Sequence, residues 1–205
     1  MFSIKASLKY GWEKFKTNKE IAILTTLLVF AVSSLGNMDS RSIFWTLAVV
    51  IFSIIIRIGY TKIFLKISDG ENTKFVEIFQ EYKIFWRYLG VSILCGLAVL
   101  GGLILLIIPG IIWAVRFSFA GLIVVDTNIG PIVAMKESYA ITKGKFWKLL
   151  GFFVVLGLIN ILGVLVLIVG LLVSVPVSIF AWIYVYRELS KTKAGLLETS
   201  SHQTI

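Results

Sequence analysis

One long apolar stretch constrains the fold more than any other feature of the sequence. Residues 89–125 carry a single charged side chain, Arg116. Built as one α-helix, this stretch would reach about 55 Å, whereas the hydrocarbon core of a bilayer is about 30 Å thick. The stretch must therefore turn. We expect the turn at Pro109 and Gly110, because proline lacks a donor N–H and glycine tolerates turn geometry.

Composition indicates the class of protein. The chain is 58% hydrophobic and has a mean hydropathy of +0.94, whereas soluble domains are roughly 45–50% apolar. A net charge of +9 suits nucleic-acid binding when it forms a soluble basic face, but here the lysines lie between apolar runs. We therefore expect an integral membrane protein with no nucleic-acid partner.

The apolar runs predict an all-α polytopic fold of six transmembrane helices. A span needs about 20 residues, and the six runs are 21–35, 42–67, the two halves of 89–125, and the two halves of 146–186, divided near Gly170. The first run is short for a span. Short connections within each pair predict three hairpins.

A polar stretch with helical spacing precedes each hairpin. Its apolar positions are Ile4, Leu8, Trp12 and Phe15 in the first copy, Phe75, Ile78, Phe79, Tyr82, Phe85 and Trp86 in the second, and Ile132, Met135, Tyr139 and Phe146 in the third. This spacing predicts amphipathic helices at the membrane interface. Trp12, Trp86 and Trp147 lie at span entries, which favours that interpretation over polar connectors packed on the bundle.

The distribution of basic residues predicts the orientation. In the six-span arrangement, every lysine and arginine except Arg41, Arg57 and Arg116 falls on one side. By the positive-inside rule, that side is cytoplasmic, with both termini there and the protein in the inner or plasma membrane. The region before residue 21 is long and contains Glu13 and Glu20, which disfavours a cleaved signal peptide.

The sequence repeats internally. "KIFWRYLG" at 83–90 matches "GKFWKLLG" at 144–151, and the same offset aligns Gly102 with Gly163 and Phe119 with Phe180. We predict one membrane domain, 1–190, made of units at about 1–70, 71–130 and 131–190, followed by a polar tail, 191–205. Units with an even number of spans repeat in the same orientation, unlike the inverted repeats frequent in transporters.

The segment 108–151 resembles the six-span membrane domain found in front of some bacterial glycerophosphodiester phosphodiesterases and as stand-alone membrane proteins. The resemblance rests on Pro109, Gly110, Arg116, Asp126, Gly130, Pro131, Ser138, Gly144, Phe146 and Trp147. It implies a six-helix membrane domain. In the fused enzymes hydrolysis belongs to a soluble domain, and the tail after the last apolar run is too short for one. The resemblance therefore implies no enzymatic activity for this chain.

The sequence predicts neither catalysis nor a metal or cofactor site. The sole histidine, His202, and the sole cysteine, Cys95, cannot form a metal cluster between them. Asp69 and Asp126 each follow the end of an even-numbered span. We expect these aspartates to cap helices or form ion pairs, with a catalytic carboxylate dyad as the alternative.

Two arginines lie within predicted spans. Arg57 and Arg116 are about 14–15 Å from the polar ends of their helices, and a charged residue at depth costs roughly 2.5–3.5 kcal/mol. One explanation is an internal ion pair or snorkelling. The other is an anion site in which Arg57 and Arg116, with Lys62 and Lys66, bind a phospholipid headgroup, since guanidinium groups match phosphate.

Three classes of function follow. The favoured one is a non-enzymatic membrane protein that binds anionic phospholipids of the cytoplasmic leaflet, or scaffolds a membrane or cytoplasmic protein of lipid metabolism or the envelope. The alternative is a transporter or channel for a lipid or small anion, which needs a water-filled path to Arg57 and Arg116. An intramembrane enzyme would require Asp69 and Asp126 to converge with a polar partner.

Overall fold

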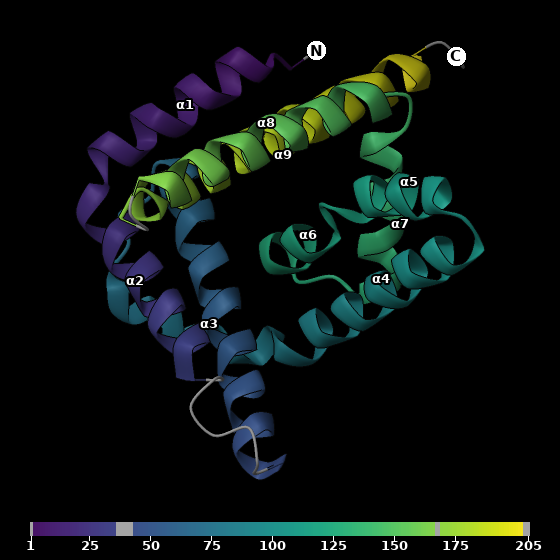
Figure 1. Cartoon of the computed structure of the whole chain (residues 1–205). Helices are drawn as coiled ribbons and strands as arrows, with labels where there is room; N and C mark the ends of the chain where they lie inside the picture. Colours follow the sequence, from purple (N-terminus) through teal and green to yellow (C-terminus); the bar gives the residue numbers. More distant parts are fainter. Residues whose placement is uncertain (1, 36–42, 167–168, 203–205) are drawn as a thin grey trace.

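The computed structural model describes residues 2–35, 43–166 and 169–202, and within them it contains helices and no strand (Figure 1). This confirms the all-α prediction. The elements are α1 (Ile4–Thr17), α2 (Lys19–Leu35), α3 (Ile43–Asp69), the 3-10 helix η1 (Phe75–Ile84), α4 (Phe85–Leu105), α5 (Ile107–Phe117), α6 (Ala120–Thr127), α7 (Pro131–Thr142), α8 (Phe146–Leu165) and α9 (Leu171–His202). Helix α9 therefore continues into the predicted polar tail.

Several helices are long and apolar enough to cross a membrane. Five such spans occur among the described residues: Ile43–Asp69, Phe85–Leu105, Ile107–Thr127, Phe146–Leu165 and Leu171–Gly195. The third of them consists of α5 followed by α6. Helix α2 has 17 residues and is not among the five. The chain is therefore an integral membrane protein by the length and hydropathy of its helices.

Neighbouring long helices pack in pairs. Helix α2 contacts α3, α4 contacts α5, and α8 contacts α9, while α1 lies along α9 (Figure 1). The α1–α9 contact is close because a Cβ atom on Gly11 would lie 2.4 Å from the carbonyl oxygen of Val177. The expected first turn, at residues 36–41, lies outside the described residues.

The bend between α4 and α5 corrects one sequence prediction. The chain turns at Leu106, whose backbone is extended, and Pro109 and Gly110 lie in the first turn of α5. Proline is tolerated there because the first N–H groups of a helix have no acceptor within it. Gly110 instead allows close packing, since a Cβ atom on Gly102 would lie 2.9 Å from the Gly110 Cα.

Helices α8 and α9 also approach each other closely at a pair of glycines. A Cβ atom on Gly170 would lie 2.4 Å from the carbonyl oxygen of Gly163. Gly163 is the residue that the internal repeat aligns with Gly102. The two pairs thus share a glycine contact near their bends, which lets the helix backbones approach each other closely.

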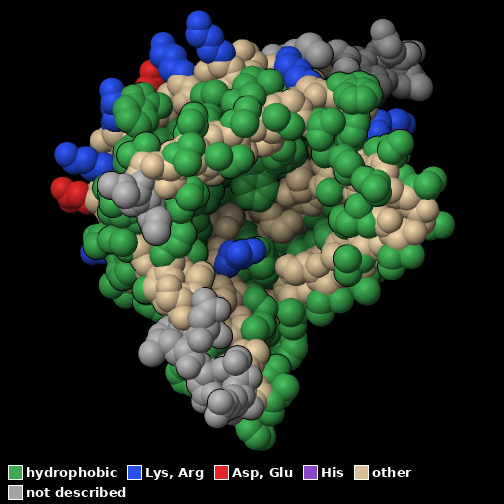
Figure 2. All heavy atoms as spheres, viewed as in Figure 1, with side chains coloured by type: hydrophobic (Ala, Val, Ile, Leu, Met, Phe, Trp, Pro, Cys, Tyr) green, Lys and Arg blue, Asp and Glu red, His purple; other side chains and the backbone are tan. Residues whose placement is uncertain are grey.

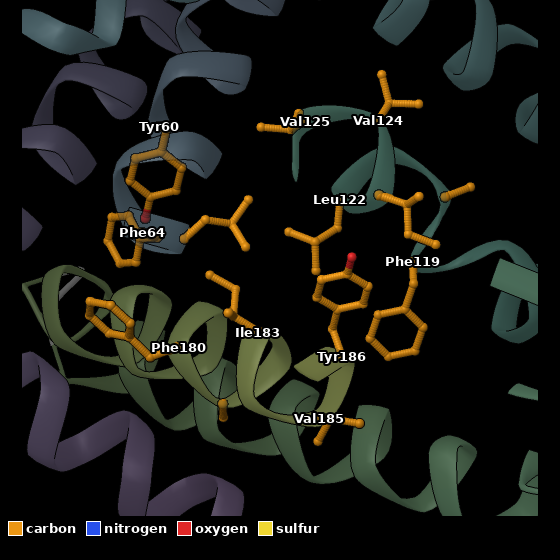
Figure 3. Packing of buried hydrophobic residues seen from close by; sticks show 14 of the residues in the cluster. Tyr60, Phe64, Phe119, Leu122, Val124, Val125, Phe180, Ile183, Val185 and Tyr186 are labelled. Atoms are coloured by element: carbon orange, nitrogen blue, oxygen red, sulfur yellow. The ribbon is translucent and has the colours of Figure 1, made fainter. Parts of the chain in front are cut away.

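The buried core lies between α3, α6 and α9 (Figure 3). The Phe64 ring packs between the rings of Tyr60 and Phe180, with centroid distances of 4.5 Å on each side. Leu122 of α6 and Ile183 of α9 are each 1% exposed or less and extend this layer. Helix α9 therefore holds the α3 and α6 elements together.

One of the three polar helices differs from its expected form. The second is a 3-10 helix, η1, rather than an α-helix. In α7 the apolar positions Ile132 and Tyr139 are 60% and 45% exposed, and a second face, of Ala134, Ser138, Ile141 and Thr142, is buried. The sequence pattern did not predict that buried face. The physical reason is that small residues allow helices to approach within a membrane protein, while bulky apolar side chains face lipid without cost.

Candidate functional site

The membrane segment that carries Arg116 is interrupted at Ser118 and Phe119, between α5 and α6. Ser138 of α7 bridges the interruption. Its Oγ donates a hydrogen bond to the Arg116 carbonyl oxygen (2.7 Å) and accepts one from the Phe119 N–H (3.3 Å). Thr142 Oγ1 lies 3.4 Å from the same carbonyl oxygen. Irregular backbone at membrane depth is tolerated where the protein satisfies it in this way.

Sequence reasoning assigned Ser138 no role beyond the family resemblance. The available signal was the spacing of Ser138 and Thr142, which places two hydroxyls four residues apart on the small-residue face of α7. The backbone groups that these hydroxyls contact belong to another helix. The contact therefore depends on tertiary packing.

Replacing Ser138 by alanine is expected to lower the free energy of unfolding by about 1–3 kcal/mol, because it leaves buried backbone groups without partners. Thermal unfolding in detergent micelles measures the loss. Ser33→Ala is the matched control, since the exposed Ser33 hydroxyl bonds only the Val29 carbonyl of its own helix. Equal midpoints for the two variants would show that Ser138 does not support the interruption.

Arg116 has no carboxylate partner among the described residues. Its guanidinium carbon lies 4.7 Å from the centroid of the Tyr139 ring. Its Nε and Nη1 atoms are buried and have no hydrogen-bond partner. Asp126, the nearest carboxylate along the sequence, is paired with Arg187 instead. Among the described residues, therefore, no ion pair accounts for Arg116.

Arg116 lines an apolar groove between α5 and α8. The groove has a volume of about 550 Å³. Its other lining residues are Ile108, Ile111, Ile112, Phe146, Trp147 and Leu150. Trp147 is 81% exposed, so the groove reaches the surface of the helical bundle. One cation thus lies within walls that are otherwise hydrocarbon or aromatic.

Arg57 lines a different cavity, which we call the central cleft. Its volume is about 350 Å³. The lining residues are Val29, Arg57, Tyr60, Thr61, Tyr88, Ser118, Gly121, Leu122, Val175, Ile179 and Trp182. The Arg57 guanidinium is close enough to the Tyr88 hydroxyl to interact with it electrostatically. Figure 2 shows a hollow with a basic side chain inside it on this face of the molecule.

The predicted anion site therefore does not form as one cluster. The groove at Arg116 and the central cleft share no lining residue. Lys62 and Lys66 line neither of them. Lys62 Nζ donates to the Val125 carbonyl oxygen (3.2 Å), and Lys66 Nζ donates to Glu77 Oε2 (2.7 Å). Sequence spacing could not foresee this, because the arginines lie on helices whose relative rotation is set by packing.

The contact between Lys66 and Glu77 changes the acidity of the Glu77 carboxyl group. The hydrogen bond from the Lys66 ammonium, followed by one from the Lys74 backbone N–H, holds the pKa of the Glu77 carboxyl below its ordinary value. The pair joins the end of α3 to η1. Lys66 thus has a structural contact at the polar end of its helix.

Asp69 and Asp126 converge on Arg187 of α9. Arg187 Nη1 lies 2.6 Å from Asp126 Oδ2, and its Nη2 lies 2.7 Å from Asp69 Oδ2. The Tyr186 hydroxyl donates a further hydrogen bond of 2.7 Å to Asp126 Oδ2. We call these four residues the ionic cluster. It joins the C-terminal ends of α3 and α6 to the middle of α9.

Helix α1 also contacts this end of the molecule. Lys14 Nζ donates to the Ile67 carbonyl oxygen (2.9 Å), and the Tyr10 hydroxyl donates to the Ser68 carbonyl oxygen (3.0 Å). These carbonyls belong to the last turn of α3, where a helix lacks intrahelical donors. Burial, the largest influence, raises the pKa of Tyr10 above its ordinary value.

The ionic cluster is suited to holding helices together. Arginine stays protonated, so both carboxylates face a permanent cation, and the predicted ion pairs of the two aspartates form here. Asp69 and Asp126 also converge with a polar partner, which is the arrangement that the alternative of a catalytic carboxylate dyad required. Sequence reasoning counted Arg187 only as a basic residue after the last span. It did not predict that Arg187 pairs with Asp69 and Asp126, because this contact depends on the packing of three helices. Within the part of the chain that the structure describes, no group of three or more His, Cys, Asp or Glu side chains gathers for a metal ion.

The fold defines a class, a polytopic helical membrane protein, and comparison with known proteins does not narrow that class further. No protein-family profile matches the chain, and no solved structure matches it. It is similar to an uncharacterised protein of Mycobacterium bovis and to uncharacterised proteins of two strains of Mycobacterium tuberculosis. Each is 24% identical over an alignment 233 positions long, gaps included, which covers 92% of this chain and 69% of the relative.

Proposed function

We propose that this protein is a non-enzymatic membrane protein that binds an anionic phospholipid through Arg116. The observation that carries the proposal is the position of the Arg116 guanidinium, which lines the apolar groove with two buried nitrogens that lack partners. A phosphate group supplies the acceptors that these donors need, in a charge-assisted hydrogen bond. The Tyr139 ring offsets part of the cost of the charge before a lipid arrives.

The groove and the arginine would contribute differently to lipid binding. An acyl chain gains little by leaving bulk lipid for the groove, because both surroundings are apolar. The groove therefore serves to position the lipid. Selection among lipids would come from the charge of the headgroup at Arg116, where the surroundings are poor in water and the interaction is strong.

The proposal includes a six-span arrangement. Helix α2 would be the short sixth span, and the pairs α2 and α3, α4 and α5, and α8 and α9 would be three hairpins. Helices α1, η1 and α7 would then lie at the interface that bears most lysines, and the positive-inside rule favours a cytoplasmic location for it. The resemblance to the membrane domain of glycerophosphodiester phosphodiesterases is part of the same proposal.

Native mass spectrometry of the purified protein tests the lipid site. Wild type is expected to retain an anionic phospholipid, and Arg116→Leu is expected to lower its retention roughly tenfold, as the loss of one charge-assisted contact implies. Arg116→Lys should give an intermediate result, because it keeps the charge without the planar guanidinium. Lys191→Leu removes an exposed basic residue that lines neither cavity, and it serves as the control.

Unchanged lipid retention in Arg116→Leu would refute the lipid site at Arg116. If wild type itself retains no preferred lipid, the basic interfacial helices become the better candidate, and scaffolding of a membrane or cytoplasmic protein replaces lipid binding as the proposal. Unfolding midpoints of every variant accompany the spectra, so that a folding defect is separated from loss of a ligand.

Transport of a lipid or small anion is the second candidate, and the central cleft is the observation that favours it. Conduction would require a path from Arg57 to the ionic cluster. Phe64 lies between Arg57 and Asp69 along α3, and Leu122 and Ile183 each precede a residue of the cluster by four positions. These three side chains form a packed layer that is 1% exposed or less (Figure 3). The packing therefore favours binding over conduction.

A further inference from the structure

The central cleft lies where the three helix pairs meet. Its lining comes from α2 and α3, from α4 with α6, and from α9. Ser118, at the interruption between α5 and α6, is part of the lining. A helix interruption at membrane depth is tolerated when the backbone lines a polar cavity. The location is thus suited to a ligand that touches every hairpin.

The polar groups of the cleft include donors and acceptors. Arg57 is its one basic lining residue, and the indole N–H of Trp182 is buried with no hydrogen-bond partner. The Ser118 hydroxyl donates to the Val115 carbonyl oxygen (2.9 Å), and the Thr61 hydroxyl donates to the Arg57 carbonyl oxygen (2.8 Å). With their protons engaged, these two oxygens remain available as acceptors. A ligand that carries both a negative charge and hydroxyl groups satisfies this set.

The cleft is closed toward the polar end of the helices. Arg57 precedes Asp69 by twelve residues on α3, which corresponds to about 18 Å. The core layer of Phe64, Leu122 and Ile183 and then the ionic cluster occupy that length. A ligand would therefore enter from the membrane rather than from the side that bears the ionic cluster.

We propose that the central cleft binds the headgroup of a hydroxylated anionic lipid, with its phosphate on Arg57 and its hydroxyls on Ser118, Thr61 and Trp182. The volume of about 350 Å³ equals roughly a dozen water molecules, which exceeds the size of a phosphate group alone. A free phosphorylated polyol has the same chemistry as such a headgroup. This site is separate from the groove at Arg116, so each proposal can fail without the other.

The test uses the full chain in nanodiscs that contain phosphatidylglycerol, followed by native mass spectrometry. Wild type is expected to retain two phosphatidylglycerol molecules, and Arg57→Leu and Arg116→Leu are each expected to retain one. Trp182→Phe removes only the indole N–H donor and should weaken retention at the cleft severalfold. In nanodiscs with phosphatidic acid, whose headgroup lacks a polyol, occupancy that depends on Arg57 is expected to fall roughly tenfold.

The outcomes of this test separate the two proposals. Two retained molecules in Arg57→Leu overturn the cleft proposal, whereas two in Arg116→Leu overturn only the proposed function. Glycerol 3-phosphate binding to the lipid-free protein, lost in Arg57→Leu, identifies a soluble ligand and overturns the lipid. Equal Arg57-dependent occupancy by phosphatidic acid overturns the role of the hydroxyls. Should Arg57→Leu fail to fold, Arg57→Lys and Trp182→Phe provide the comparison, and unchanged retention in both overturns the proposal.

Discussion

Alanine in place of Gly59 is expected to lower the free energy of unfolding by at least about 3 kcal/mol, the range of the most damaging single substitutions. A Cβ atom at this position would lie 1.8 Å from the Ile78 carbonyl oxygen and 2.7 Å from its Cα. These are backbone atoms of η1, so no side-chain rotation relieves the overlap. Helix α3 and η1 must move apart, which also strains the pair of Lys66 and Glu77. Unfolding in detergent micelles measures the loss.

Gly96→Ala and Gly157→Ala are matched controls for this prediction. Neither glycine has any atom within 4 Å of an added Cβ, and both lie within helices. Alanine is favoured over glycine in a helix by roughly 0.5–1 kcal/mol, so the controls should be neutral or slightly stabilising. If Gly59→Ala is as stable as these variants, the close packing of α3 on η1 is not required for the fold.

Arg187→Met is expected to cost about 2–4 kcal/mol, because it leaves two carboxylates close together without a cation. The estimate lies below that for fully buried pairs, since the side chains of Arg187 and Asp69 are 30% and 40% exposed, and that of Asp126 is 14% exposed. Thermal and denaturant unfolding in detergent measure the change. The stability of Arg187→Lys should lie between that of wild type and that of Arg187→Met, because an ammonium keeps the charge but loses the bidentate contact to Asp126.

Two further variants test the origin of that loss. Lys191→Met removes an exposed charge four residues away on the same helix and should be nearly neutral. Adding Asp69→Asn and Asp126→Asn to Arg187→Met should restore part of the stability, because contacting charges are not additive. A triple variant that is less stable than Arg187→Met would contradict electrostatic repulsion as the cause.

The outline of the fold was predictable because bilayer thickness limits helix length. The long run at 89–125 had to bend, and it does. The exact place was missed, since proline fits the first turn of α5 as well as it fits a loop, and Leu106 carries no turn signal. In α7 the pattern identified the apolar positions, but it did not predict the buried face of small residues, because that face is set by the close approach of neighbouring helices.

The candidate site was less predictable than the fold. Arg57 and Arg116 could be predicted as site residues because a charged side chain within a membrane span is costly. Both line cavities in the structure. They were predicted to form one site, whereas their separation depends on how the helix pairs rotate against one another. The contacts of Arg187 and Ser138 were not predicted, for a related reason. Their partners lie 61 and 22 residues away along the chain, and no local pattern encodes such contacts.

The ionic cluster also constrains the order in which the protein can be assembled. Asp69 and Asp126 precede Arg187 in the sequence, so they are synthesised before it. The two carboxylates therefore have no cation partner until α9 is made. Helix α1 cannot take up its final packing before α9 is made, because α9 provides the surface on which α1 packs. The helices that precede α9 therefore form an unfinished bundle that a nascent chain must carry in the membrane. The bundle is complete only when α9 packs against α1.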